Sequence, residues 1–423
     1  MITTPFYQSL YDHFQNSALQ TRYLEHIRDI SLSIPRSARW KYSWLDSVLR
    51  SSYFPANTQE ITIDTSVLDA IPSPRITFIH GYFAPDFSDL SCMPSGVNIQ
   101  TRSEPEHCLT EENLSQSNDP SVFFFLLNRV FCNQKFTLSI DDGVQFPHPL
   151  HIVWLTEPTK QNQAWNTQNR IQIGSRAHVQ CIEHVLGHGT SHLANIDTQI
   201  TLGAYAQFSH LRILAKQNTS THILRTNINL STNSIYNRTE LDFGCNVSVH
   251  TASVQLKGDN AHAHCNGIIL TDGQRHAITD LHVAHLCPKT TCQLDWRGIS
   301  SDVSSLAFQG GIHIHPSALE SRAHLSSKNL LLSDNARIDV RPNLVIDVED
   351  VQASHGTTVG QFDPDALFYL RARGITENMA KRILSNAFCH TPLSNLPKEL
   401  RSWADTYLNQ TLLIQETGSQ NDL

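Results

Sequence analysis

The sequence predicts a mainly β protein with helical segments at both ends. Between about residues 136 and 360, runs rich in Val, Ile, Leu and Thr recur between Gly, Asn, Asp and Ser breaks. A spacing of about one strand per 10–12 residues, with no helical pattern between the runs, excludes an α/β arrangement and fits a sandwich, a barrel or a β-helix. The number of runs exceeds what one sandwich needs, and both ends carry helical segments able to cap open sheet edges. These two features favour the β-helix.

Residues 1–135 are expected to form an N-terminal helical region with a small hairpin. Phe6, Leu10 and Phe14 recur at four-residue spacing, which is typical of an amphipathic helix. An apolar run at 76–79 is followed by His80-Gly81 and a second short run, which predicts the hairpin.

The rest of this region is predicted from composition. Residues 100–118 are polar and are expected to form a loop. The run 121–132 is too long and too rich in Leu and Phe for one ordinary strand, so we expect a buried helix there.

The β core is assigned to residues 136–360, and its last part alternates. Apolar and acidic residues interleave from 336 to 351, the pattern of a half-buried strand. Ser354-His355-Gly356 is then expected to interrupt the strand as a turn, with Gly360 permitting a second change of direction.

Residues 361–423 are predicted to be helical. Asp363 and Pro364 are a helix N-cap and first helical residue, and Gly374 ends that helix. Thr376 is expected to cap a second helix, and the segment 400–413 a further one. The first two helices form a predicted hairpin with an apolar seam.

Composition restricts the function classes. The formal net charge is −8 over 423 residues and no Lys/Arg run occurs, so nucleic acid is not an expected partner. The nine cysteines are scattered without a C-x-x-C motif, which argues against a disulfide framework and a zinc site. The beginning of the sequence lacks a signal-peptide pattern and no long apolar run occurs, so we expect a cytoplasmic protein without a membrane partner.

No nucleotide-binding or hydrolase motif occurs, so no nucleotide site is expected on this chain itself. Histidine is abundant, at 23 residues, and two His-x-His pairs each lie on one face of a predicted strand. These pairs, and a denser group between residues 181 and 192, are better explained as structural or surface residues than as metal ligands. The residues concerned are His262 and His264, His313 and His315, and Cys181, Glu183, His184, His188 and His192.

Three segments resemble the C-terminal signature of SufD-type subunits of the SufB/SufD family. They are D-V-E-D-V at 347–351, S-H-G-T-T-V-G at 354–360 and F-Y-L-R-A-R-G-I at 368–375. The resemblance implies a right-handed parallel β-helix. It also implies a non-catalytic scaffold subunit of the SufBCD complex, which supports iron–sulfur cluster assembly and iron entry.

The resemblance implies two partners and one site. A SufB-like subunit would pair with the end of the β-helix, and a SufC-like ATPase would dock on the C-terminal helices and supply the nucleotide site. His355 matches a histidine of the SufB–SufD interface, so it is the candidate metal ligand for a nascent iron–sulfur cluster shared with the SufB-like partner. Members of the family can carry a cysteine two residues before this histidine, where this sequence has Ala353.

Other departures limit what is transferred from the family. Ala38 stands where a Glu is usual before Trp-Lys-Tyr, and Thr290 stands where a Cys is usual after His282-Val-Ala-His285. No role is therefore assigned at either place, and Cys287 and Cys292 do not occupy the family position.

Two alternative functions remain open at this point. One is a self-contained β-helix enzyme, such as a polysaccharide lyase or a metal-dependent hydrolase that uses the histidine pairs. The other is a SufB-like, cluster-holding subunit, against which the unpatterned cysteines argue.

Overall fold

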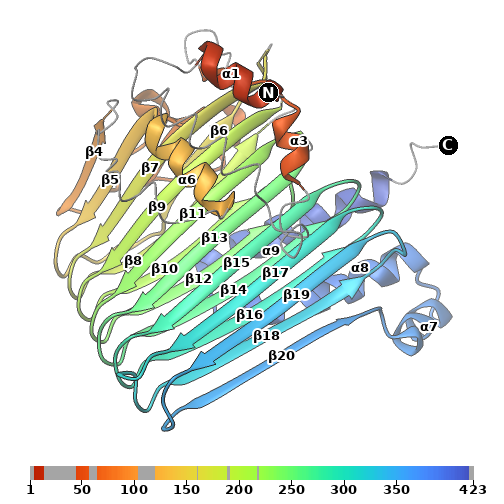
Figure 1. Ribbon diagram of the computed structural model, residues 1–423. Helices are drawn as coiled ribbons and strands as arrows, with labels where there is room; N and C mark the ends of the chain where they lie inside the picture. Colours follow the sequence, from red (N-terminus) through yellow and green to blue (C-terminus); the bar gives the residue numbers. More distant parts are fainter. Residues whose placement is uncertain are drawn as a thin grey trace.

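The chain winds into a parallel β-solenoid of about eight turns, which confirms the predicted parallel β-helix. The computed structural model describes residues 4–13, 44–56, 64–102, 120–159, 161–187, 191–216 and 219–418. Strands alternate between two ten-stranded sheets, here called sheet A and sheet B, and each strand pairs in parallel with the strand one turn further along (Figure 1). One turn takes about 29 residues.

Sheet A contains the odd-numbered strands of the solenoid and two strands at its N-terminal end. These are β1 (Phe54–Pro55), β4 (Val97–Arg102), β5 (Gln134–Ile140), β7 (Gln163–Ile173), β9 (His192–Leu202), β11 (Thr221–Leu230), β13 (Val247–Leu256), β15 (His276–His285), β17 (Ser305–Ile314) and β19 (Arg337–Ile346).

Sheet B contains the even-numbered strands and the small hairpin. These are β2 (Arg75–Ile79), β3 (Tyr82–Phe83), β6 (Leu150–Thr156), β8 (His178–Gly187), β10 (Gln207–Leu214), β12 (Ile235–Asp242), β14 (His262–Thr271), β16 (Thr291–Ser300), β18 (Arg322–Leu331) and β20 (Gln352–Gly360). β2 and β3 are antiparallel, as the hairpin prediction requires.

The turns that lead from sheet A to sheet B share one backbone feature. In each of six successive turns a residue other than glycine adopts a left-handed conformation, with φ between 55° and 61°. These residues are Arg176, Tyr205, Asn233, Asn260, Lys289 and Glu320. Gly258 in this stack has no room for a Cβ, which would lie 2.0 Å from the backbone nitrogen of Thr232. The turns therefore stack backbone on backbone, and this fixes the register of both sheets.

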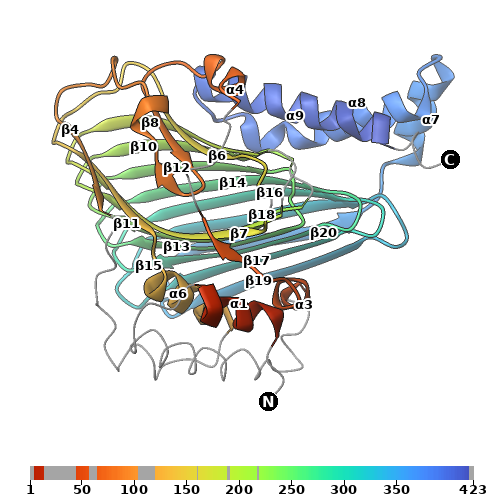
Figure 2. The same cartoon turned by 90° about the horizontal axis from the view of Figure 1, so that it is seen from above.

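Helices cover the outer faces of both sheets (Figure 2). On sheet A lie α1 (Pro5–His13), α3 (Leu45–Leu49) and α6 (Pro120–Val130), whose aromatic and aliphatic side chains pack against the strands. The Asn128 side chain of α6 donates to the carbonyl oxygens of Thr167 and Asn195, at 3.0 and 2.8 Å, and so fastens the helix to β7 and β9.

On sheet B lies α9 (Lys398–Gly418), longer than the segment 400–413 predicted for it. Leu400, Ala404 and Leu408 are fully buried and pack against Ile182 and Leu211 of the sheet. Before α9 come α7 (Pro364–Ala372), α8 (Glu377–Cys389) and the short 3-10 helix η3 (Thr391–Leu393). Two further short helices, α4 (Ser66–Asp69) and η2 (Pro85–Phe87), lie near β2.

Several local predictions can be compared with these elements. The helix expected at 121–132 is α6, and Asp363 and Thr376 cap α7 and α8 through their side-chain oxygens. The loop expected at 100–118 is wrong at its start, because residues up to Arg102 pair with β5. Residues 103–119, and the predicted helical positions between 14 and 43, lie outside the described residues.

None of the helices in the described ranges combines the length and apolar character that a membrane span requires.

Candidate functional site

The C-terminal end of the solenoid is open. β19 pairs only with β17, and β20 only with β18, among the described strands. Half-buried apolar side chains from the last turn, including Ile338, Leu344 and Ala353, pack on the core from this end. Val345, Ile346 and Val359 are exposed at 41%, 43% and 49%. The last turn therefore presents unpaired backbone groups and apolar side chains together, the combination from which further strand pairing starts.

His355 lies in this last turn, in the middle of β20 (Figure 1). The expected turn at Ser354-His355-Gly356 is wrong, because all three residues pair in register with β18, His355 opposite Leu325. The interruption lies earlier instead, between the end of β19 at Ile346 and the start of β20 at Gln352. Local composition predicts a reverse turn at this tripeptide. Lateral pairing with the preceding coil of the solenoid makes it a strand instead.

The surroundings of His355 follow from that register. Its side chain is exposed and shares a strand face with Ala353, whose methyl group packs on the core. The neighbouring Ser354 faces the other way, and its hydroxyl lies 2.8 Å from Nδ1 of His324 on β18. His355 is thus an imidazole at the open rim of the core.

The two other candidate histidine pairs do not come together at a common site. His262 and His264 lie on β14 of sheet B, whereas His313 lies on β17 of sheet A. The His313 and His315 rings are 4.0 Å apart, and Nε2 of His313 lies 2.7 Å from Oδ2 of Asp347. Among the described residues, no group of three or more His, Cys, Asp or Glu side chains is arranged to hold a metal ion.

The group between residues 181 and 192 separates in the same way. Cys181 points into the core, His184 packs against Trp403 of α9 on the outside, and His192 contacts His222 on sheet A at 3.0 Å. His188 lies outside the described residues. Strand alternation therefore distributes these side chains over different environments.

Most cysteines in the described part of the chain are buried, and all of them are free. Cys292 faces the core, where its thiol lies 3.2 Å from Nε2 of His285. Nδ1 of the same ring lies 2.7 Å from the hydroxyl of Thr290, the residue at which the resemblance leads one to expect a cysteine. Cys287 is only partly buried.

A charged network lies inside the solenoid, and it was not predicted from the sequence. Glu240 of β12 is 1% exposed and is bound by three cationic or titratable groups. Its carboxylate lies 3.0 Å from Arg212, 3.0 Å from Arg238 and 2.8 Å from Nδ1 of His250. Along their strands, these charged residues alternate in phase with inward-facing apolar residues such as Leu214, which lies two positions after Arg212. That alternation is the sequence signal from which their inward orientation could have been predicted.

Glu183 of β8 extends this network. It accepts a hydrogen bond from Trp154 Nε1 at 2.8 Å and lies 3.3 Å from Nε2 of His210. Burial by itself would raise the pKa of Glu183, but the hydrogen bond from His210 and the charge of Arg212 outweigh it and lower the pKa to about 2. The interior of the middle turns is therefore held together by paired charges as well as by apolar packing.

The helices after the solenoid leave apolar side chains uncovered. Phe368 and Tyr369 of α7 are 72% and 53% exposed, and Met379 and Ile383 of α8 are 38% and 39% exposed. α7 lies beyond the ends of the strands, away from both sheet faces (Figures 1 and 2). α7 has no buried residue, whereas α8 contacts sheet B through Phe388 and Cys389 at its C-terminal end.

Comparison with known families identifies the fold. The model of the SufBD core domain, described as SUF system FeS cluster assembly, matches residues 156–388. The chain belongs to the SufBD family. The SufBD core match begins at the last residue of β6 and ends in α8, so it contains both the open end and His355.

Individual SufBD relatives match over most of their length. The chain is 24% identical to an iron–sulfur cluster assembly SufBD family protein of Synechocystis, over 87% of this chain and 85% of the relative. It is 23% identical to the iron–sulfur cluster assembly protein SufD of Escherichia coli, over 87% and 86%. It is 22% identical to the chloroplastic protein ABCI7 of Arabidopsis thaliana, over 96% and 90%. SufBD membership thus connects the chain with iron–sulfur cluster assembly.

Proposed function

We propose that this chain is a SufD-type scaffold subunit that works in a SufBCD-like complex. It pairs with a SufB-like subunit, binds a SufC-like ATPase and supports iron–sulfur cluster assembly and iron entry without a catalytic site of its own. The observation that carries the proposal is the open last turn of the solenoid, where unpaired strands, exposed apolar side chains and His355 occur together.

The SufB-like subunit is proposed to continue the sheets at this end. The outer edges of β19 and β20 offer backbone donors and acceptors, and pairing would also bury Val345, Ile346 and Val359. A partner with a similar open end would gain the same burial, so the joint is favourable for both chains.

The nascent cluster is treated as cargo held between two subunits. A single imidazole cannot retain an iron ion, and among the described residues no group of three or more His, Cys, Asp or Glu side chains is arranged to hold one. Imidazole nevertheless suits iron, and thiolates from the partner would complete a mixed ligand set. His355 is therefore proposed as this chain's contribution to a site that only the complex contains.

The SufC-like ATPase is proposed to dock on the C-terminal region, residues 361–423. Phe368 and Tyr369 supply large apolar side chains on a projecting helix, which is how a helix anchors itself in a partner's groove. The three predicted segments then have separate tasks: the described helices of 1–135 cover the outer face of sheet A, 136–360 presents the open end, and 361–423 binds the ATPase.

One experiment tests the pairing directly. The chain is co-expressed with SufB-type and SufC-type subunits and recovered through a tag on the SufB-type subunit. Val359→Glu is expected to abolish recovery, because it places a charge in the joint. Val303→Glu serves as the matched control, since Val303 is 50% exposed in a turn on the side of the solenoid. Equal recovery of Val359→Glu and the unmodified chain would refute the proposed joint.

Experiments on the isolated chain address the alternatives. A stable cluster reconstituted on the isolated chain would favour a SufB-like, cluster-holding role, and turnover of a sugar polymer by the isolated chain would favour an enzyme. The expected cytoplasmic location stays a prediction, and one relative is named as chloroplastic.

A further inference from the structure

The outer face of sheet A carries a polar surface that the proposed function does not use. Next to α6, outward-facing side chains of neighbouring strands stand opposite one another in rows. One row runs Arg102, Lys135, Gln168, Asp197, Arg225, and the row beside it runs Gln100, Thr137, Arg170, Gln199, Asn227. The rows alternate with core-facing residues such as Phe136 and Leu138, so the polar side chains point away from the interior.

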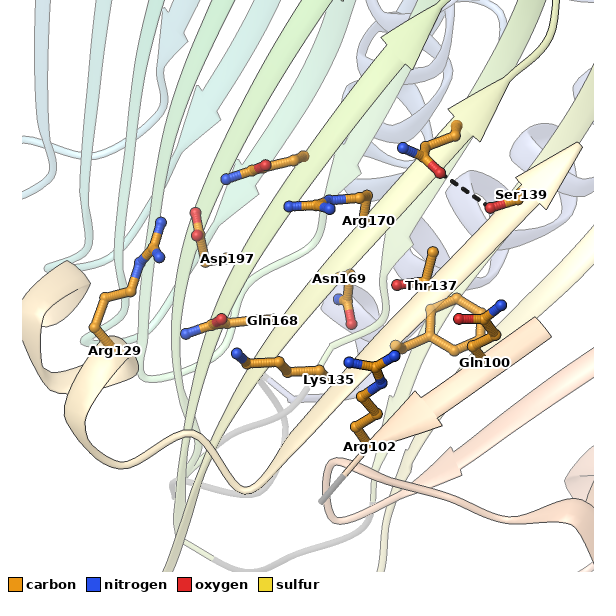
Figure 3. A pocket seen from close by; sticks show the side chains of 13 residues that line it. Gln100, Arg102, Arg129, Lys135, Thr137, Ser139, Gln168, Asn169, Arg170 and Asp197 are labelled. Carbon is orange, nitrogen blue, oxygen red and sulfur yellow. Dashed lines mark hydrogen bonds between the residues drawn. The ribbon is translucent and has the colours of Figure 1, made fainter. Parts of the chain in front are cut away.

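The parts of these rows on β4, β5, β7 and β9, together with Arg129 of α6, line a cavity of about 370 Å³ (Figure 3). Four cations face it, Arg102, Arg129, Lys135 and Arg170, against the single carboxylate of Asp197. The chain as a whole has a formal net charge of −8, so this local excess of positive charge is not a consequence of composition. A concave site with several cations at short spacing attracts an anion.

Asp197 adds a second requirement for a ligand of this cavity. Its side chain is 4% exposed beneath α6, and Oδ1 has no hydrogen-bond partner among the described residues. Burial raises the pKa of Asp197, while the charges of Arg225 and Arg129 oppose that rise. Nε of Arg129 is likewise buried, with no hydrogen-bond partner in the described part of the chain. Buried polar atoms of this kind are normally satisfied, so a ligand that offers a hydroxyl group to Asp197 fits the cavity.

The lining also excludes one common kind of anion. Gln100, Gln168, Gln172 and Gln199 supply amides that suit hydroxyl groups, whereas no aromatic face is available for stacking. Phe136 is 2% exposed, and the guanidinium groups of Arg225 and Arg129 already lie 4.0 and 4.9 Å from the ring centre of Phe125. A nucleobase would find no platform here.

We propose that this cavity binds a small phosphorylated polyhydroxy compound of the sugar-phosphate class. The phosphate contacts Arg102, Lys135 and Arg170, where guanidinium groups can bind two oxygens at once. The hydroxyl groups contact Asp197 and the glutamine amides. The volume lies in the range of small-ligand pockets.

Calorimetric titration of the full chain tests this assignment, with fructose 1,6-bisphosphate, ribose 5-phosphate, citrate and inorganic phosphate as probes. The sugar phosphates are expected to bind more tightly than citrate and inorganic phosphate. Arg170→Gln is expected to weaken sugar-phosphate binding at least tenfold, because Arg170 is exposed and its loss removes a phosphate contact without disturbing the core. Lys328→Gln, an exposed lysine on β18 of the opposite sheet, should leave binding unchanged.

A further variant separates the two halves of the site. Asp197→Asn is expected to weaken the binding of ribose 5-phosphate and to leave inorganic phosphate unaffected, since the latter lacks hydroxyl groups on carbon. Circular dichroism confirms that the variant is folded. Absence of binding by every probe at 10 mM (about the weakest affinity worth assigning to a site), equal binding by Arg170→Gln, or tighter binding of citrate than of either sugar phosphate would overturn the proposal.

Discussion

Glu240 is the residue on which the interior charge network of the solenoid depends. It is fully buried and interacts with Arg212, Arg238 and His250. The three partners compete with burial, which alone would raise the pKa of Glu240, and hold that pKa well below its ordinary value. Glu240 is thus the nearest countercharge of two buried arginines, and Glu183 lies 3.7 Å from one of them, Arg212.

Glu240→Gln is expected to destabilise the protein by about 3–5 kcal/mol, because it removes the carboxylate 3.0 Å from both buried guanidinium groups and leaves Glu183, 3.7 Å from Arg212, as the remaining countercharge. The free energy of unfolding is measured in urea near pH 7. Glu320→Gln is the control, since Glu320 is 58% exposed and its contact with Lys289, at 3.8 Å, is long for an ion pair. This substitution should lower the free energy of unfolding by less than about 0.5 kcal/mol. Similar losses for both variants would contradict the structural role given to the network.

His355→Ala is expected to leave folding unchanged, because the side chain is exposed, and to lower the iron and sulfide content of the co-expressed complex. The control is His178→Ala, an exposed histidine six strands away in sheet B, about 29 Å along the solenoid. Normal maturation of iron–sulfur enzymes by His355→Ala, in cells that rely on this assembly route, would refute the role of the imidazole.

At the scale of single residues, the sequence identifies candidate functional residues better than it predicts what surrounds them. His355 is found from its neighbours in the chain, but its strand conformation depends on β18, which lies about 30 residues earlier. Ser and Gly beside it indicate a turn only when the chain is taken by itself. The Glu240 network escapes prediction for a similar reason, because its members come from three different turns.

At the scale of elements, α7 and α9 differ in what they contact. α9 covers apolar side chains of sheet B, whereas α7 has no buried residue. Removing everything after Gly360 would therefore expose the outer face of the sheet as well as delete the proposed ATPase site. Point substitutions on α7 separate the two effects.

Phe368→Glu is expected to abolish recovery of the SufC-type ATPase with the chain while the SufB-type subunit is still recovered. The reason is that Phe368 is 72% exposed, so a charge there disturbs a docking surface and not the fold. Leu319→Glu is the control, an apolar residue 48% exposed in a turn of the solenoid. If Phe368→Glu retains the ATPase, the docking site lies elsewhere.

The strands themselves were predicted unevenly from the sequence. Apolar runs correspond to β6, β8, β10 and β13, but β7 and β18 are rich in Gln, Asn, His and Lys. A flattened solenoid needs only alternate residues for its core, and hydrogen bonds to the turns before and after stabilise the rest. Polar strands of this kind become visible only once the repeat is known.

At the scale of the molecule, buried histidines make stability depend on pH. Burial lowers the pKa of His151 to about 4, of His184 to about 3 and of His285 to about 4. The unfolded chain binds protons at these residues as the pH falls below 6.5, and the folded chain does not. Stability therefore falls as the pH decreases through that value.

Between pH 7.5 and 5.5 these three histidines are expected to reduce the free energy of unfolding by about 1.3 kcal/mol each, roughly 4 kcal/mol together. Urea unfolding at several pH values measures the loss. This window lies above the range in which Glu183, with its lowered pKa, loses its contribution, which begins below about pH 4.5. A flat profile for the unmodified chain would contradict the burial of these rings.

The two ends of the solenoid are not equivalent, and this limits how large an assembly can grow. At the N-terminal end, antiparallel β4 and β3 terminate the sheets, so the parallel register stops there. Among the described strands, the parallel register runs to an open edge only at the opposite end, which favours a joint of two molecules, end to end, over a head-to-tail fibre. A protein built from repeating coils thereby presents different edges at its two ends, and growth by adding identical coils is disfavoured at one of them.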